Sequence, residues 1–180
     1  PRGRAGRLPI VAKTFRLPDG STAEFEIVGD ASLRAVACVA LTNRNTAVVA
    51  EQYRPGPERI MLDLPGGGVD PGETLLDAAA RELAEETGYV PGDLTFLGDM
   101  SYGGYYGNSR SYFLATGCER RQEQDLDDGE FVTVREVSPA ELVTAAMTAR
   151  LTDPGGVLLA LPHLMRDQGV QRLLQPPAST

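Results

Sequence analysis

Three glutamates occupy one short stretch of the chain at a spacing that suits metal binding. Glu82, Glu85 and Glu86 stand at positions i, i+3 and i+4, so on a helix their carboxylates share one face. Like charges at this spacing repel one another, and a divalent cation among them removes the repulsion. Magnesium prefers such oxygen ligands. The cluster therefore indicates a metal site, and a solvated acidic helix face is the alternative on these residues alone.

The residues around the acidic cluster favour the metal site. Arg81 precedes Glu82 and lies four residues before Glu85, within reach of an ion pair. The three consecutive glycines at 66–68 allow the backbone to approach an ion or a phosphate closely. Apolar residues on the opposite side of the same helix are expected to pack it against a sheet: Leu75, Leu76, Ala79, Ala80 and Leu83. Packing would therefore hold the acidic face in place.

The spacing of this segment resembles the signature of the Nudix hydrolases. Gly67, Glu73 and the run RELAEETG at 81–88 match the defining polar and glycine positions, and the last position, usually aliphatic, is Tyr89. Further segments resemble the ADP-ribose pyrophosphatase branch of that family, and with them the similarity spans about residues 10 to 165. They are the hairpin at 15–28, EQYRP at 51–55, LPGG at 64–67 and DGEFV at 128–132.

The resemblance implies hydrolysis of a pyrophosphate bond in a nucleoside-diphosphate compound by a metal-bound water, with Mg²⁺ as cofactor and Mn²⁺ as the other candidate. The metal ligands that it implies are Glu82, Glu85, Glu86 and the carbonyl of Gly66. Arg81 would orient the glutamates; the alternative is a helix salt bridge that contributes little. Glu73 would support the loop or the metal, and its alternative is a carboxylate that stabilises the helix dipole.

The general base that the resemblance implies is Glu130, in the Asp-Gly-Glu-Phe-Val pattern. In related pyrophosphatases a glutamate from a mobile loop can take this role. The neighbours of Glu130 make the loop strongly acidic, so a solvated loop is the alternative; they are Glu123, Asp125, Asp127 and Asp128.

Three further residues are candidates for substrate binding. Arg54 suits a phosphate or terminal sugar because a guanidinium fork matches phosphate oxygens, and an exposed arginine after an edge strand is its alternative. Asp63 is either a substrate contact or a strand-end residue. Tyr105 lies in a loop with Tyr102 and Tyr106, where it would stack on a base or anchor the loop.

The tyrosine loop leaves the substrate open. ADP-ribose pyrophosphatases usually carry a proline at this distance beyond the motif, and residues 101–109 contain none. Tyrosines there are reminiscent of dinucleoside polyphosphate hydrolases. Two alternatives therefore stand beside ADP-ribose or a related nucleotide sugar: a dinucleoside polyphosphate hydrolase, and a non-catalytic nucleotide-sugar or ADP-ribose sensor on the same fold.

Composition and charge limit the kinds of partner that this chain is expected to bind. With 180 residues and a net charge of -8, the chain is a poor electrostatic partner for nucleic acids or anionic membranes. No apolar run approaches the roughly 18 residues of a membrane span. Cys38 and Cys118 have no metal-ligand spacing and require no oxidising compartment, so we expect a cytoplasmic protein. The only histidine, His163, is expected to be structural.

The elements that must position these residues follow from turn and cap signals. A hairpin is expected at 10–17 and 21–28 around Pro18-Asp19-Gly20, and a helix between Thr74 and Gly88. Further strands are expected at 33–41, 46–53, 60–64, 94–100, 109–116 and 130–136, and further helices at 138–150 and 157–165.

These elements predict an α/β (α+β) fold, a Nudix-type α/β/α sandwich with a mixed sheet and an N-terminal antiparallel hairpin. We expect a flexible tail at 1–9, one domain at 10–170 and a loose tail at 171–180. By resemblance, the strands at 10–32 would build a homodimer.

Overall fold

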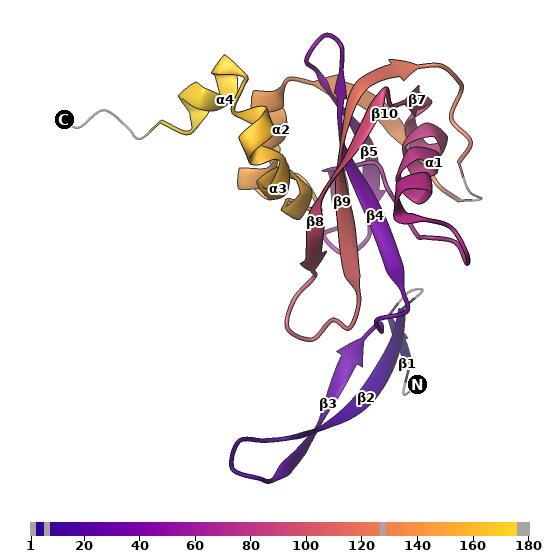
Figure 1. The fold of residues 1–180 in the computed structure, drawn as a ribbon, viewed down its shortest axis with the longest axis vertical. Helices are drawn as coiled ribbons and strands as arrows, with labels where there is room; N and C mark the ends of the chain where they lie inside the picture. Colours follow the sequence, from indigo (N-terminus) through magenta and orange to yellow (C-terminus); the bar gives the residue numbers. More distant parts are fainter. Residues whose placement is uncertain (1–2, 6–7, 127–128, 176–180) are drawn as a thin grey trace, which may run out of the picture.

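The fold is a layered sandwich around a mixed sheet (Figure 1). In the computed structural model, which describes residues 3–5, 8–126 and 129–175, the sheet runs in the order β10–β5–β4–β9–β7, with β6 beside β5 and β8 beside β9. β4 and β9 pair in parallel and the other neighbours pair antiparallel. The strands are β4 (Arg34–Thr42), β5 (Ala47–Arg54), β6 (Arg59–Asp63), β7 (Tyr89–Val90), β8 (Asp93–Ser101), β9 (Ser109–Arg120) and β10 (Thr133–Val137).

Helices cover both faces of this sheet (Figure 1). α1 (Leu75–Thr87) packs on one face, and α2 (Pro139–Met147), α3 (Gly155–Leu164) and α4 (Gln168–Leu173) lie on the other. Successive residues of a strand point to opposite faces. In β4, Val36 and Cys38 accordingly share a core with α1, whereas Ala37 and Val39 share one with α2 and α3. The predicted α/β/α sandwich with a mixed sheet is confirmed.

α1 begins and ends where its cap residues predict. The Thr74 hydroxyl accepts a hydrogen bond from the Asp77 N–H at 3.1 Å, and Gly88 adopts a φ of 75° that suits glycine. Ala78, Ala79 and Leu83 are buried against the sheet. The apolar side of the helix therefore fixes the direction in which its glutamates point.

An N-terminal sheet projects from this body (Figure 1). Strands β1 (Gly3–Ala5), β2 (Leu8–Arg16) and β3 (Thr22–Val28) pair antiparallel, which confirms the predicted hairpin. Backbone hydrogen bonds join its end to the tyrosine loop, from the Val28 N–H to the Tyr105 carbonyl and from the Gly107 N–H to the Val28 carbonyl. The tyrosine loop thus links the projecting sheet to the body.

Several boundaries differ from the sequence expectation. Strand β1 lies within the tail expected at 1–9, because its backbone pairs with β2, which an Arg- and Gly-rich composition does not reveal. Helix α4 continues to Leu173, past the expected domain end at 170, because Asp167 caps it and Val170 is buried. β10 begins at Thr133 instead of 130. The rest of the two expected tails, residues 1–2, 6–7 and 176–180, lies outside the described residues, and the division into one domain and two tails remains a prediction.

No helix among the described residues is long and apolar enough to cross a bilayer.

Candidate active site

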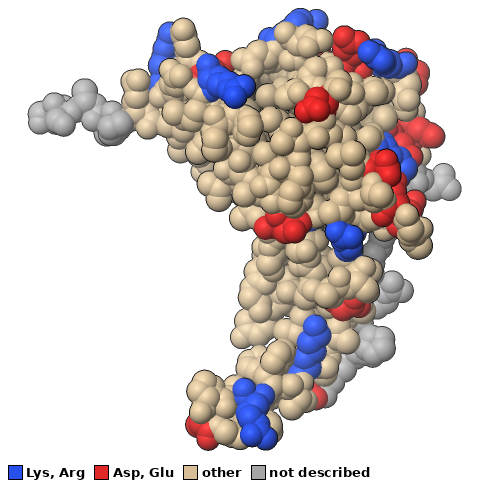
Figure 2. Space-filling model, in the orientation of Figure 1, with Lys and Arg blue, Asp and Glu red and all other residues tan. Residues whose placement is uncertain are grey.

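The predicted metal ligands line one cleft of about 410 Å³ beside α1. Figure 2 shows acidic side chains gathered on this flank of the molecule. The cleft is bounded by the glycine loop at 66–68, by the glutamates of α1 and by the acidic loop before β10. Its lining includes Gly66, Arg81, Glu82, Glu85, Glu86, Asp125 and Glu130. The structure therefore brings most of the sequence-predicted catalytic and metal-binding residues together.

Arg81 is the centre of the hydrogen bonding in this cleft. Its Nη1 donates to Glu82 Oε1 at 3.0 Å and to Glu85 Oε2 at 2.8 Å. Its Nε donates to Glu73 Oε1 at 2.8 Å, and Nη2 donates to the Gly68 carbonyl at 3.0 Å. The guanidinium also holds the pKa of Glu73 below its usual range. Arg81 thus ties the start of the helix segment, the glycine loop and two of the three glutamates into one unit.

Glu86 is the most deeply buried acid of the cluster. Its pKa is raised to about 8, chiefly by burial and in addition by the charges of Glu82, Glu130 and Asp63, while the Gly66 N–H that donates to Oε2 at 2.9 Å opposes the rise. The pKa of Glu82 is also raised, chiefly by burial. Both carboxylates are therefore held where an added cation would favour their charged form.

The glycine loop lies against β4 at a distance that only glycine allows. The carbonyls of Pro65 and Gly67 accept hydrogen bonds from the N–H groups of Cys38 and Val36 at 2.8 and 2.9 Å. A Cβ at Gly66 would clash with the Val36 carbonyl oxygen, and one at Gly67 would meet Glu82 Oε2 at 2.5 Å. In an extended segment alternate carbonyls point to opposite sides, so the Gly66 carbonyl does not point toward β4.

A divalent cation fits the chemistry of this donor set. Among the described residues, no three acidic, histidine or cysteine side chains converge tightly enough to complete a metal site by themselves. Arg81 is paired with Glu82 and Glu85 in this arrangement. The side chains that line the cleft are nevertheless mainly carboxylates, which hard cations prefer, and the pKa of Glu86 is raised by burial and by neighbouring carboxylates, an effect that a bound cation would oppose.

The acidic loop that carries Glu130 is attached to the end of α1. The Asp125 N–H donates to the Glu85 carbonyl at 2.8 Å. The Gln124 side chain donates to the carbonyls of Glu86 and Val132 at 2.7 and 3.3 Å. Glu130 faces the cleft, and its charge acts on both Glu82 and Glu86. Its neighbours Asp127 and Asp128 lie outside the described residues.

The sequence-predicted substrate residues do not line this cleft. Arg54 Nε donates to Asp63 Oδ2 at 3.0 Å, and the other oxygen of this buried carboxylate accepts a hydrogen bond from the Thr152 hydroxyl. Tyr105 is 61% exposed, and its ring lies 6.4 Å from that of Phe25 in the N-terminal sheet. The substrate roles of Arg54, Asp63 and Tyr105 remain predictions.

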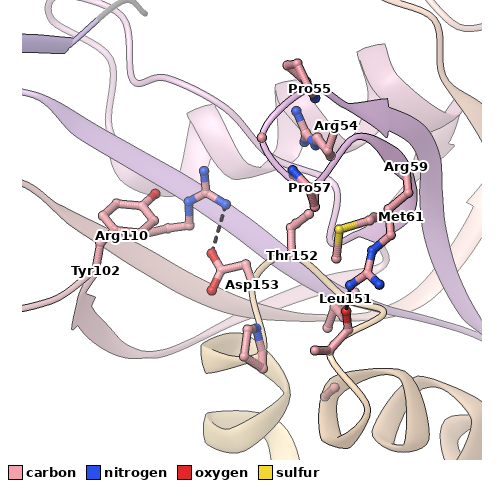
Figure 3. Close-up of a pocket in the computed structure, with 14 residues that line it drawn as sticks. Arg54, Pro55, Pro57, Arg59, Met61, Tyr102, Arg110, Leu151, Thr152 and Asp153 are labelled. Carbon is pink, nitrogen blue, oxygen red and sulfur yellow. Dashed lines mark hydrogen bonds and ion pairs between the residues drawn. The ribbon is translucent and has the colours of Figure 1, made fainter. Parts of the chain in front are cut away.

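Arg54 instead lines a second pocket, of about 720 Å³ (Figure 3). Its walls come from the β5–β6 turn, from the loop after β8, from β9, and from the segment between α2 and α3. We call this the arginine pocket, because its polar lining includes Arg54, Arg59, Arg110, Tyr102, Thr152 and Asp153. Sequence reasoning missed Arg59, Arg110 and Asp153, because they are isolated residues in separate segments and carry no spacing signal.

Tyr89, at the position where the signature usually has an aliphatic residue, has its own partner. Its ring is buried and its hydroxyl donates to Glu136 Oε1 at 2.7 Å. Arg44 and Thr46 also donate to this carboxylate. The departure from the signature therefore concerns a residue outside the cleft lining.

Comparison with known proteins identifies the family of this chain. Residues 31–156 match the family model described as the NUDIX domain. The Bacillus methanolicus protein named methanol dehydrogenase activator is 33% identical over 158 residues, which is 87% of this chain and 83% of the relative. The Bacillus subtilis ADP-ribose pyrophosphatase is 32% identical over 133 residues, 73% of this chain and 71% of the relative.

The fold also matches a solved structure. A crystal structure of an ADP compounds hydrolase superposes with a TM-score of 0.73 at 22% identity, covering 93% of this chain and 91% of the other. At that identity the match supports the fold alone. The family match over residues 31–156, which is more than half of the chain, shows that the chain belongs to the Nudix family of hydrolases.

Proposed function

We propose that this protein hydrolyses the pyrophosphate bond of ADP-ribose or a related nucleoside-diphosphate sugar in a Mg²⁺-dependent reaction, giving a nucleoside monophosphate and a sugar phosphate. The observation that carries the proposal is the cleft of about 410 Å³ beside α1, which we call the acid cleft. In it one arginine organises the glutamates of α1 beside a glycine loop. The substrate class follows the name of the ADP-ribose pyrophosphatase relative.

Each group in the cleft has a role in this proposal. Glu82, Glu85, Glu86 and the Gly66 carbonyl would hold the divalent cation, which when bound neutralises diphosphate charge and lowers the pKa of water. Arg81 and Glu73 position the glutamates through their mutual hydrogen bonds. Glu130 takes the proton from the attacking water, which it can approach from the loop above the cleft. The protein thus contributes positioning and electrostatics.

Substrate binding would require more than the acid cleft. Arg54 and Asp63 lie together at the β5–β6 edge, and Tyr105 lies at the base of the N-terminal sheet. We propose a cytoplasmic homodimer in which this sheet packs on a second copy. Its support is the projection of the sheet from the body (Figure 1) and the exposure of Phe15 and Tyr105. A monomer by light scattering would contradict the dimer.

The activity is tested by phosphate release, after phosphatase coupling, from a panel of nucleoside-diphosphate sugars. We expect turnover with Mg²⁺ that a chelator abolishes, with Mn²⁺ as a second metal. Absence of metal-dependent turnover on every member would overturn the proposal. Binding of ADP-ribose without turnover would instead support a sensor.

A second candidate, a dinucleoside polyphosphate hydrolase, is favoured by the tyrosine loop. The rings of Tyr102 and Tyr106 lie 5.8 Å apart, and both are exposed, so they offer surfaces for a second base. The panel should therefore include diadenosine polyphosphates. A higher kcat/KM on these compounds than on ADP-ribose would favour this candidate.

A further inference from the structure

The arginine pocket lies at the β5–β6 edge of the sheet, and none of its lining residues lines the acid cleft. Side chains alternate along β9, and Tyr112 belongs to the core under α2 and α3, whereas Phe113 belongs to the core under α1. Arg110 has the parity of Tyr112 and therefore lies on the α2–α3 face. The glutamates of the acid cleft are carried by α1 on the other face. Arg54 and its strand partner Arg59 have the parity of Val48 and lie on the α1 face, so the pocket wraps around the β5–β6 edge. The two sites are distinct in that they share no lining residue.

The arginine pocket is positive within an acidic protein. Three arginines line it together with one carboxylate, that of Asp153, and the buried Asp63 pairs with Arg54 from behind. The local balance of three cations and two carboxylates leaves an excess of one positive charge, in a chain whose net charge is -8. Because the local charge is opposite in sign to the net charge, small anions should bind at this pocket in preference to the acidic rest of the surface.

Arg110 is held rigidly but has spare donors. Its Nη1 donates to Asp153 Oδ2 at 2.9 Å, and its Cζ lies 5.4 Å from the centre of the Tyr102 ring. The Tyr112 hydroxyl donates to the other oxygen of Asp153 at 2.5 Å. Among the described residues, the buried Nε of Arg110 has no hydrogen-bond partner. A buried donor without a partner is one feature of a site that a water or an anion completes.

Arg59 approaches the same space from the opposite wall (Figure 3). Its Nη2 donates to the Ala149 carbonyl at 2.7 Å, and no ion pair joins it to a carboxylate of the described residues. This contact turns the guanidinium toward the segment that carries Thr152 and Asp153. Two positioned forks with unused donors suit phosphate oxygens, which accept such hydrogen bonds in pairs.

We propose that the arginine pocket is a second ligand site, which binds a small phosphomonoester through Arg59 and Arg110. Its volume of about 720 Å³ exceeds what a phosphate group fills and falls in the usual range of small-molecule pockets. The organic part of the ligand lies along the apolar lining of Pro57, Met61 and Leu151. The site requires no metal ion, because the cations are supplied by the protein.

The test is a titration of the ¹⁵N-labelled full chain with ribose 5-phosphate in the presence of a chelator, followed by amide NMR shifts. We expect saturable shifts in residues 149–155, with ribose alone producing none. In Arg59→Gln the Kd should rise by about fivefold to tenfold, roughly the effect of one charged contact. Arg59→Lys retains the charge, so its Kd should lie between that of the wild type and that of Arg59→Gln.

Arg150→Gln is the matched control. Arg150 is an exposed neighbour outside the pocket lining, and its Nε contacts the Thr148 hydroxyl, so the Kd should stay within about twofold of the wild type. Equal effects of the Arg59 and Arg150 variants would overturn the proposal, as would shifts confined to residues 66–68 and α1. Absence of saturable shifts at millimolar ligand would also overturn it. Since no turnover is measured, the outcome is independent of the hydrolase activity.

Discussion

The acid cleft and the arginine pocket show two ways of holding like charges together in two sites that share no lining residue. In the acid cleft one arginine contacts several carboxylates, and Glu86 still has a pKa raised to about 8. In the arginine pocket Arg54 and Arg110 each pair with an aspartate, and the guanidinium of Arg110 keeps an unused donor. The first region lacks positive charge and the second lacks acceptors. Each therefore points to the ligand that would supply what it lacks, a divalent cation or a phosphate group.

The largest expected effect comes from removing a charge in the acid cleft. Glu86→Gln deletes a proposed metal ligand, so metal-dependent kcat/KM should fall by about 10³-fold, at the upper end for one electrostatic group in a site. Glu123→Gln is the control, because that side chain is 92% exposed and pairs with Arg120 at the surface. Near-normal turnover of the Glu86 variant would show that the raised pKa does not mark a metal ligand.

A smaller loss is expected from the proposed base. Glu130→Gln keeps the shape of the side chain but cannot accept a proton, so kcat should fall by about 10²-fold while KM changes little. Steady-state kinetics on the preferred substrate measures both constants. A rise in KM with unchanged kcat would place Glu130 in substrate binding instead. Glu123→Gln again serves as the control from the same acidic loop.

Neutralising a carboxylate should affect stability in opposite ways in the two regions. Asp153→Asn leaves the partly buried Arg110 without its ion pair, so the free energy of unfolding should drop by about 2 kcal/mol. In metal-free protein, Glu86→Gln replaces an acid whose charged form is disfavoured by burial and by neighbouring carboxylates, so stability should stay the same or rise. Urea unfolding in the presence of a chelator measures both. Equal losses would contradict the contrast between the two charge balances.

The smallest effect concerns Glu136, a carboxylate outside both regions whose donors balance its charge. Hydrogen bonds from Thr46, Tyr89 and Arg44 lower its pKa from 4.5 to about 2. A lowered pKa stabilises the fold above the unfolded pKa, and this contribution is lost as the pH falls from about 4.5 to about 2. Glu136→Gln should therefore lower the free energy of unfolding at neutral pH by less than about 1 kcal/mol, because the Arg44–Glu136 ion pair is partly exposed to solvent. A difference from the wild type that does not shrink toward about pH 3 would contradict this account.

The sequence predicted the acid cleft far better than the arginine pocket, for a physical reason. Helical spacing alone places Glu82, Glu85 and Glu86 on one face, and the caps at Thr74 and Gly88 fix the ends of that helix. Arg110 and Asp153 are 43 residues apart and meet only because α3 packs on β9. Strand β1 was missed likewise, because backbone pairing with β2 creates it. Local periodicity predicts elements and the sites within them, but not sites assembled from distant segments.

The hydrogen bonds of Arg81 have a consequence for how a metal ion enters. The carboxylates of Glu82 and Glu85 are already paired with the guanidinium of Arg81. An incoming metal ion would therefore replace Arg81 as the partner of these two carboxylates, which the arginine already holds close together. Arg81 keeps Glu73 and the Gly68 carbonyl as partners during this exchange. Little conformational order has to be gained on loading, so ion uptake should be fast and should leave the position of α1 unchanged.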